Sequence, residues 1–430
     1  MEWVSSSANT KHKWDNGLGN HKQKVRRLSI LACVLSRNIK IGRHKCHIKE
    51  KRFFSGVIRP SLKLQLYMIT MLKLITYRGR LIMKQIIVRL FSPISRNKKS
   101  HKMAWARVWQ AAIEHHTGFP CELMHEAKPW SEYDRVYVYF NLEPYDRLSL
   151  FGGPQPQYAE FIKCAEGFNG EIVALDKPLA RFGEFCKARC FNKHGEPNMK
   201  VPELWRGIDW DSIQAQFDKA TCLTMASLPL EDVTLGDSHS ISVWQPGYKA
   251  YRCDAQTLRG ALKRGLSSFL PDKVRNLTIY FGNIDVRYHF GLQNNPISDV
   301  LEKLDEYEKQ LVGLKESGQV TGEIELVHLL PIEDESRKIP TNNMLNGKSF
   351  NGSWAERNSW MNIFNNGLSE IAFKHGFKVH TWPSRWYVET YKDPKSFFTR
   401  LEAMKGLHLA LPFYRYEGFK DSNTLELFDI

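Results

Sequence analysis

The chain has 430 residues, of which 42% are hydrophobic and 25% charged, a composition that suits globular domains and excludes a disordered or fibrous protein. The formal net charge of +15 is unevenly distributed, because residues 1–102 carry 24 Lys and Arg against 3 acidic residues and residues 103–430 have a net charge of −6. The mildly acidic larger part is therefore not expected to bind nucleic acid specifically.

The first 102 residues match neither a signal peptide nor a membrane span. Lys and Arg interrupt the apolar residues between 62 and 89, so no apolar run reaches membrane-spanning length. No short apolar core with a small-residue cleavage site follows the start. We interpret 1–102 as a basic, poorly ordered extension, with Met103 as the expected start of the protein proper. A membrane-surface anchor is the alternative for this extension.

Neither the cysteines nor the glycines indicate a metal or a cofactor. The eight cysteines include no Cys-x-x-Cys pair, which favours reduced thiols and a cytoplasmic location. His44, Cys46 and His47 lack a second ligand pair at zinc spacing. Gly152 and Gly153 match no dinucleotide or phosphate-loop spacing. We expect no cofactor and no metal, and no pattern predicts an oligomeric state.

Helical and extended patterns alternate from 103 onward, which predicts α/β domains built on parallel sheets. In the first half, helices are expected at 104–116, 157–167, around 178–190 and 209–219, with strands at 135–140 and 171–175. In the second half, strands are expected at 251–258, 275–281, 323–330 and 377–381, with helices starting at 298 and spanning 353–375 and 396–405. A boundary near 228 divides a smaller domain at 103–228, to which no role is assigned, from a second domain at 229–430.

A turn near the start of the second domain is the strongest candidate for chemistry. Residues 233–240 read Val-Thr-Leu-Gly-Asp-Ser-His-Ser, an expected strand that runs into a turn and a helix start. There the hydroxyl of Ser238 would face backbone N–H groups, and a weak nucleophile needs such donors and a base. A capped turn without catalysis is the alternative, since Asp and Ser are ordinary N-caps. Sites in parallel sheets lie beyond the carboxyl ends of the strands, where Ser238, Gly282 and the residues after 381 fall.

Three blocks follow one another in the second domain. They read Gly-Asp-Ser-His at 236–239, Phe-Gly-Asn-Ile-Asp-Val-Arg-Tyr-His at 281–289, and Gly-Leu-His-Leu at 406–409. Together they resemble the SGNH (GDSL-type) hydrolase superfamily over roughly 229–415. The resemblance implies a flavodoxin-like three-layer fold and a serine acyl-transfer site. Ser238 would attack an ester carbonyl and His408 would take its proton. The oxyanion would be stabilised by donors from Gly260 and Asn283.

The chain departs from the family pattern at two positions. The family's oxyanion Asn falls on Ile284, with Asn283 one residue early, and a one-residue offset on an extended segment turns a side chain to the other face. The family's Asp, three residues before the His, corresponds to Lys405, which cannot stabilise an imidazolium. The acid is either missing, which leaves a Ser-His dyad, or replaced through space. The candidates for replacement are Glu402, Asp393 and Asp285.

Four polar residues are candidates for substrate contacts. Alternate positions of an extended segment project together, so Asp285, Arg287 and His289 are expected to form one face. Their chemistry suits a carboxylate, a phosphate or a sugar, with Arg287 as a bidentate donor. A buried Asp-Arg pair that fixes the loop is the alternative. Arg357, on a helix rich in aromatic residues, is open between a ligand contact and a structural role.

Two functions of different classes follow. The first is an esterase or acyltransferase acting on a small acyl ester, such as an acetylated sugar or glycan. The second is a non-catalytic module of the same fold that binds a glycan, a nucleotide-sugar or a protein. The presence of both Ser238 and His408 favours the enzyme. The binding module is favoured by Lys405 at the position of the acid, and by the alternative that His408 is only a packed, non-catalytic residue.

We predict that Lys405→Asp raises the esterase kcat/KM, because the new carboxylate would accept the second N–H of His408 and stabilise its imidazolium. Hydrolysis of p-nitrophenyl acetate across pH measures the effect, with Lys405→Asn as the control for hydrogen bonding without charge. No change in either variant, or an equal rise in both, contradicts a hydrolase weakened by loss of its acid.

Overall fold

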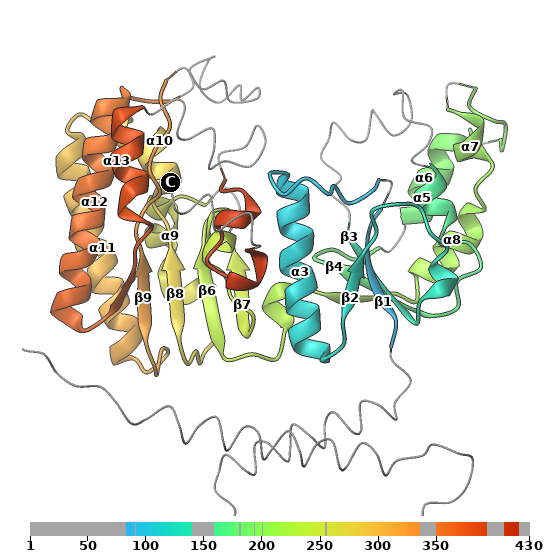
Figure 1. The fold of residues 1–430 in the computed structure, drawn as a ribbon, viewed down its shortest axis with the longest axis horizontal. Coiled ribbons are helices and arrows are strands. Elements are labelled where there is room, and N and C mark those ends of the chain that lie inside the picture. The colour runs from blue at the N-terminus through green and yellow to red at the C-terminus, as the bar shows by residue number, and fades with distance from the viewer. Residues whose placement is uncertain are drawn as a thin grey trace, which may run out of the picture. The chain divides into compact units, whose positions relative to one another are not determined.

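The fold is described from a computed structural model (Figure 1). The residues that it describes are 83–90, 92–139, 159–179, 182–192, 194–199, 201–253, 256–335, 350–393 and 408–420. The zinc-like cluster considered at 44–47, the glycines at 152–153 and the helix expected at 396–405 lie outside these ranges.

The first domain is a five-stranded parallel sheet with the strand order β2-β1-β3-β4-β5. Its strands are β1 (Gln85–Arg89), β2 (Cys121–Leu123), β3 (Arg135–Tyr139), β4 (Glu171–Leu175) and β5 (Thr221–Leu223). The helices described with them are α3 (His101–Thr117), α5 (Ala159–Lys163), α6 (Phe182–Cys190), α7 (Glu203–Arg206) and α8 (Trp210–Phe217). The prediction of an α/β domain before residue 228 is confirmed.

The second domain is also a five-stranded parallel sheet, with the order β10-β9-β8-β6-β7. Its strands are β6 (Asp232–Gly236), β7 (Tyr248–Arg252), β8 (Leu277–Tyr280), β9 (Ile324–Val327) and β10 (Lys378–His380). Counted from β6, this is the order 2-1-3-4-5 of flavodoxin-like folds, in which the chain reverses direction between β6 and β8. The expected flavodoxin-like α/β fold is confirmed.

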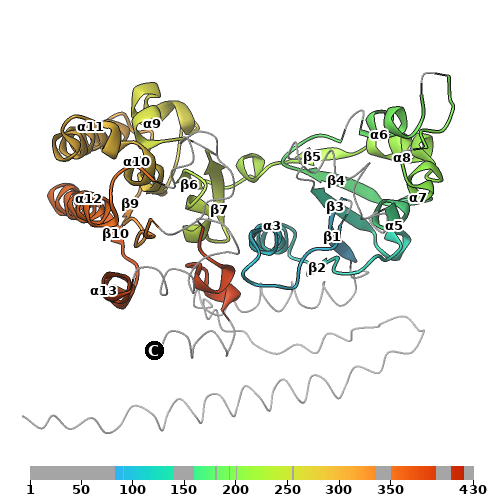
Figure 2. The ribbon, with the colours of Figure 1, turned by 90° about the horizontal axis from the view of Figure 1, so that it is seen from above.

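Helices cover both faces of the second sheet and complete three layers (Figure 2). They are α9 (Leu258–Arg264), α10 (Asn283–Tyr288), α11 (Pro296–Glu316), α12 (Trp354–His375) and α13 (Ser384–Lys392). The helix expected to start at 298 is α11, which begins at Pro296 after the N-cap Asn295 and buries an apolar stripe that includes Val300, Leu304 and Leu311. α12 starts with a reciprocal capping box, in which Ser353 and Glu356 each satisfy the other's backbone N–H.

Three sequence expectations about elements are wrong. The domain start at 103 falls inside α3, and β1 before it pairs with both β2 and β3. The apolar core of β1 is only Ile86, Ile87 and Val88, too short to stand out from its basic surroundings. The strand expected at 251–258 is β7, which ends at Arg252, and α9 begins at Leu258. The segment after β8 is the helix α10, not an extended strand.

None of the helices in the described ranges is long and apolar enough to cross a membrane. Within the same ranges, no group of three or more His, Cys, Asp or Glu side chains is placed to hold a metal ion.

We predict that a fragment of residues 75–430, which retains every described element, unfolds cooperatively, whereas 103–430 does not. The shorter fragment loses the strand that pairs with β2 and β3, so its first sheet is cut in two. Thermal unfolding followed by circular dichroism compares the two fragments. A cooperative transition of equal midpoint in 103–430 would show that β1 is not needed for folding.

Candidate active site

Ser238 and His408 lie together at the carboxyl end of β6. The distance between Ser238 Oγ and His408 Nε2 is 2.8 Å, although the two residues are 170 positions apart in the chain. Both side chains are partly exposed, whereas Asp237 and His239, which flank the serine, are buried. The structure thus presents a hydroxyl bonded to an imidazole at the switch point of the sheet, where sites in such folds form.

The serine turn is held by its own backbone and by β8. Asp237 Oδ1 accepts from the His239 N–H at 2.8 Å, and the Asp237 carbonyl accepts from the Ser240 N–H at 3.0 Å. Gly236 has no room for a side chain, because a Cβ there would lie 2.2 Å from the Tyr280 carbonyl oxygen. The helix expected after the turn is only the 3₁₀ helix η4 (Ser240–Val243), too short to supply a helix dipole of any size.

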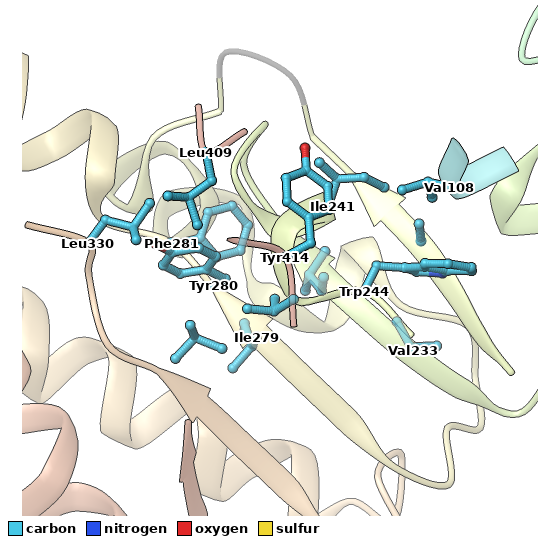
Figure 3. Close-up of a cluster of buried hydrophobic side chains, with 14 of the residues drawn as sticks. Val108, Val233, Ile241, Trp244, Ile279, Tyr280, Phe281, Leu330, Leu409 and Tyr414 are labelled. Atoms are coloured by element: carbon cyan, nitrogen blue, oxygen red, sulfur yellow. The ribbon is translucent and has the colours of Figure 1, made fainter. Parts of the chain in front are cut away.

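Contacts along residues 408–420 hold His408 over the turn. The Arg415 N–H donates to the Ser242 carbonyl of η4 at 2.8 Å, and the Arg415 guanidinium forms a two-pronged ion pair with Glu325 of β9. That pair lowers the pKa of Glu325 against the opposing effect of burial. Leu409, next to the histidine, belongs to the buried cluster that includes Tyr280 (Figure 3). The late segment is therefore tied to the sheet at several points.

A buried polar row lies behind the dyad. His239 Nδ1 is 3.0 Å from Asp237 Oδ1, and His239 Nε2 is 3.4 Å from Nη1 of Arg287. Arg287 Nε donates to Glu333 Oε1 at 2.8 Å, and both of these side chains are almost completely buried. Asp237, His239 and Glu333 were not predicted as partners in the site. The Gly-Asp-Ser-His motif includes Asp237 and His239, but the direction in which their side chains point depends on the geometry of the turn.

Of the two expected oxyanion donors, Gly260 does not fit the role and Asn283 remains a candidate. Gly260 is excluded, because it lies in α9 and its N–H donates to Thr257 Oγ1 at 2.9 Å. Asn283 is buried at the start of α10, where its Nδ2 finds no acceptor among the described residues. Gly282 permits this placement of Asn283. Its φ of 111°, which residues with a side chain rarely adopt, lets the chain turn from β8 into α10.

Asp285 has a structural role instead of the expected substrate contact or catalytic acid. Its carboxylate accepts from the backbone N–H groups of Leu258 at 2.6 Å and Arg259 at 3.3 Å, so it caps the start of α9. Burial raises the pKa of Asp285 to about 6, against the lowering effect of those two N–H donors.

The other expected substrate contacts do not converge on one face. Arg287 is fully buried against Glu333, so the predicted buried pair exists with a different acid. His289 ends α10 half-buried, and burial followed by the charge of Arg259 lowers its pKa. Arg357 is buried in the first turn of α12 and lies 4.2 Å above the ring of Phe350. The prediction that Asp285, Arg287 and His289 form one face was wrong because it assumed an extended segment, whereas α10 is a helix.

Two of the acids considered as replacements lie in the described part of the chain, where Asp393 follows α13 and Asp285 caps α9. Glu402 and Lys405 lie outside the described residues. The described part of the site includes the Ser-His pair, with His239 and its charged neighbours behind it.

The fold and this geometry define a doubly wound α/β protein with a serine-histidine pair at its switch point. No protein-family model and no curated protein matches the chain. Among solved structures, it is similar to a gut microbial diltiazem-metabolizing enzyme, with a TM-score of 0.26 and 18% identity over 39% of this chain and 41% of that one. It is also similar to the lipase/acylhydrolase from Enterococcus faecalis, with a TM-score of 0.25 and 12% identity over 46% and 91%. Such distant likenesses carry no functional argument.

We predict that Asp285→Asn gains stability relative to the wild type as pH rises from 4 to 6.5. The unfolded Asp loses its proton near pH 3.8 and the folded one near pH 6, so wild-type stability falls through this window, by about 3 kcal/mol at most. Asn keeps an acceptor for the α9 N–H groups but does not ionise. Urea unfolding of both proteins at several pH values measures the difference, and a difference that stays constant with pH contradicts a raised pKa.

Proposed function

We propose that this protein is a serine esterase or acyltransferase, with Ser238 as nucleophile and His408 as general base. The observation that carries the proposal is the 2.8 Å hydrogen bond between Ser238 Oγ and His408 Nε2. This distance lies within the range needed for direct proton transfer. A serine hydroxyl is barely ionised at neutral pH, so a base within this reach is what makes it reactive.

In the proposed reaction, Ser238 Oγ forms a bond to the ester carbonyl carbon while its proton moves to His408 Nε2. The carbonyl oxygen gains negative charge, for which the Ser238 N–H and the unpaired Asn283 Nδ2 are the candidate donors. Such donors contribute roughly 3–4 kcal/mol each. His408 then gives its proton to the leaving alcohol, which departs as the carbonyl re-forms. Water or a second alcohol, activated by His408, releases the acyl group from Ser238.

The surroundings of the dyad favour a neutral substrate over an anionic one. Arg287 and Asp285 were the expected charged contacts, and both are buried and occupied by protein partners. A carboxylate or phosphate of a substrate would therefore not find Arg287 available. We propose a small neutral acyl ester, with acetylated sugars as the first class to test.

The proposal accounts for the pattern of exposure better than a binding module does. Ser238 and His408 are accessible, while the charged groups that a carbohydrate- or nucleotide-binding cleft would use are turned inward. A binding module requires no hydrogen bond between a serine and a histidine so far apart in sequence.

We predict that Ser238→Ala and His408→Ala each reduce kcat for p-nitrophenyl acetate at least 10²-fold, as estimated for loss of a catalytic base or nucleophile. The double variant should be hardly slower than either single variant, because the two groups act as one unit. Steady-state kinetics at pH 7 to 8, with acetylated sugars as second substrates, measures these effects.

One control accompanies this comparison. His375→Ala removes a histidine that pairs with Glu308 away from the dyad. This variant should keep most of the activity. Full activity in Ser238→Ala would exclude the serine mechanism, and strictly additive losses in the double variant would exclude cooperation between the two groups.

A further inference from the structure

His239, the residue after the nucleophile, lies directly against the base. Its ring centroid is 4.6 Å from that of His408, with 33° between the planes. The His239 side chain is 4% exposed, whereas His408 is partly open to solvent. A buried imidazole therefore forms one wall of the position in which His408 must stay to reach Ser238.

The partners of His239 define its proton positions. Asp237 Oδ1, 3.0 Å from Nδ1, can only accept, and Nη1 of Arg287, 3.4 Å from Nε2, can only donate. The arrangement is satisfied when Nδ1 carries the proton and Nε2 keeps its lone pair. These two partners therefore fit the tautomer in which Nδ1 donates to Asp237 and Nε2 accepts from Arg287.

Residues from several elements lie around this ring. Asp237 comes from the serine turn, Arg287 from α10, and the ring of Tyr280 from β8 at 6.5 Å between centroids. Glu333, after β9, balances the charge of Arg287. His408 faces the ring from the late segment. Arg287 is itself fixed, because its Nη1 also donates to the Asn283 carbonyl at 3.1 Å.

We propose that His239 is a positioning residue for the base: its imidazole, fixed by Asp237 and Arg287, holds the His408 ring where it can reach Ser238. This role rests on the proposed function. The ring of His239 lies against that of His408 and is itself buried, so it limits the movement of the base away from the serine hydroxyl.

The tautomer of His239 can be tested on the wild-type full-length protein without reference to activity. Histidine ring NMR at about pH 9, where imidazoles are deprotonated, assigned with His239→Gln and His408→Gln, should show His239 as the Nδ1–H tautomer. An Nε2–H tautomer would mean that Asp237 and Arg287 do not fix the ring in this way, and it overturns the proposal.

The kinetic role is tested with His239→Ala, with His375→Ala, which removes a histidine paired with Glu308, as the control. We expect kcat for p-nitrophenyl acetate to fall about tenfold or more with KM changed less than about twofold. Added imidazole should restore part of kcat by filling the site of the lost ring. His375→Ala should alter neither kcat nor KM.

Different results refute different claims. A folded His239→Ala with unchanged kcat, or with a change in KM alone, overturns the positioning role while the dyad stands. Absence of hydrolysis by the wild-type protein refutes the proposed function and this role with it, even where His239 is the Nδ1–H tautomer. If His239→Ala does not fold, the NMR tautomer of the wild type decides.

Discussion

The parallel pairing of β6 with β7 on one side and β8 on the other determines where the functional groups of the second domain lie. The chain changes direction across the sheet at β6, so the turns after β6 and β8 open beside each other. The first turn carries Ser238 and the second leads into Asn283. Close contact of Gly236 with the Tyr280 carbonyl keeps the two strand ends together. The topology of the sheet therefore determines where the site lies.

Buried charges then make this geometry rigid. A charged group is costly to bury unless it is paired, and breaking such a pair leaves an uncompensated charge. Arg287 meets Glu333, and Asp285 meets the N–H groups at the start of α9. Both residues come from α10, so that short helix is fixed between α9 and the segment after β9. Because His239 contacts the fixed Arg287, its own ring is also held in place against His408.

The local sequence was sufficient to predict the α/β alternation and the serine turn, because a strand-turn pattern carries that information. The pairing of Ser238 with His408 was implied by the resemblance of three short blocks to a known family. It did not predict the roles of Gly260 or Asp285, whose hydrogen bonds depend on where α9 begins. One error of conformation, an extended segment in place of α10, misplaced three side chains at once. β1 was missed because its three apolar residues lie in a strongly basic stretch. Glu333 has no local signal, since it reaches Arg287 only in the folded protein.

Covalent trapping of Ser238 tests the central claim most directly. The full-length protein is incubated with a fluorophosphonate, which reacts with base-activated serines, and the modified residue is located by peptide mass spectrometry. The account predicts one adduct on Ser238 in the wild type, formed faster as pH rises and at least about 10²-fold more slowly in His408→Ala. An unmodified Ser238, or equal labelling in wild type and His408→Ala, would contradict a nucleophile activated by that histidine.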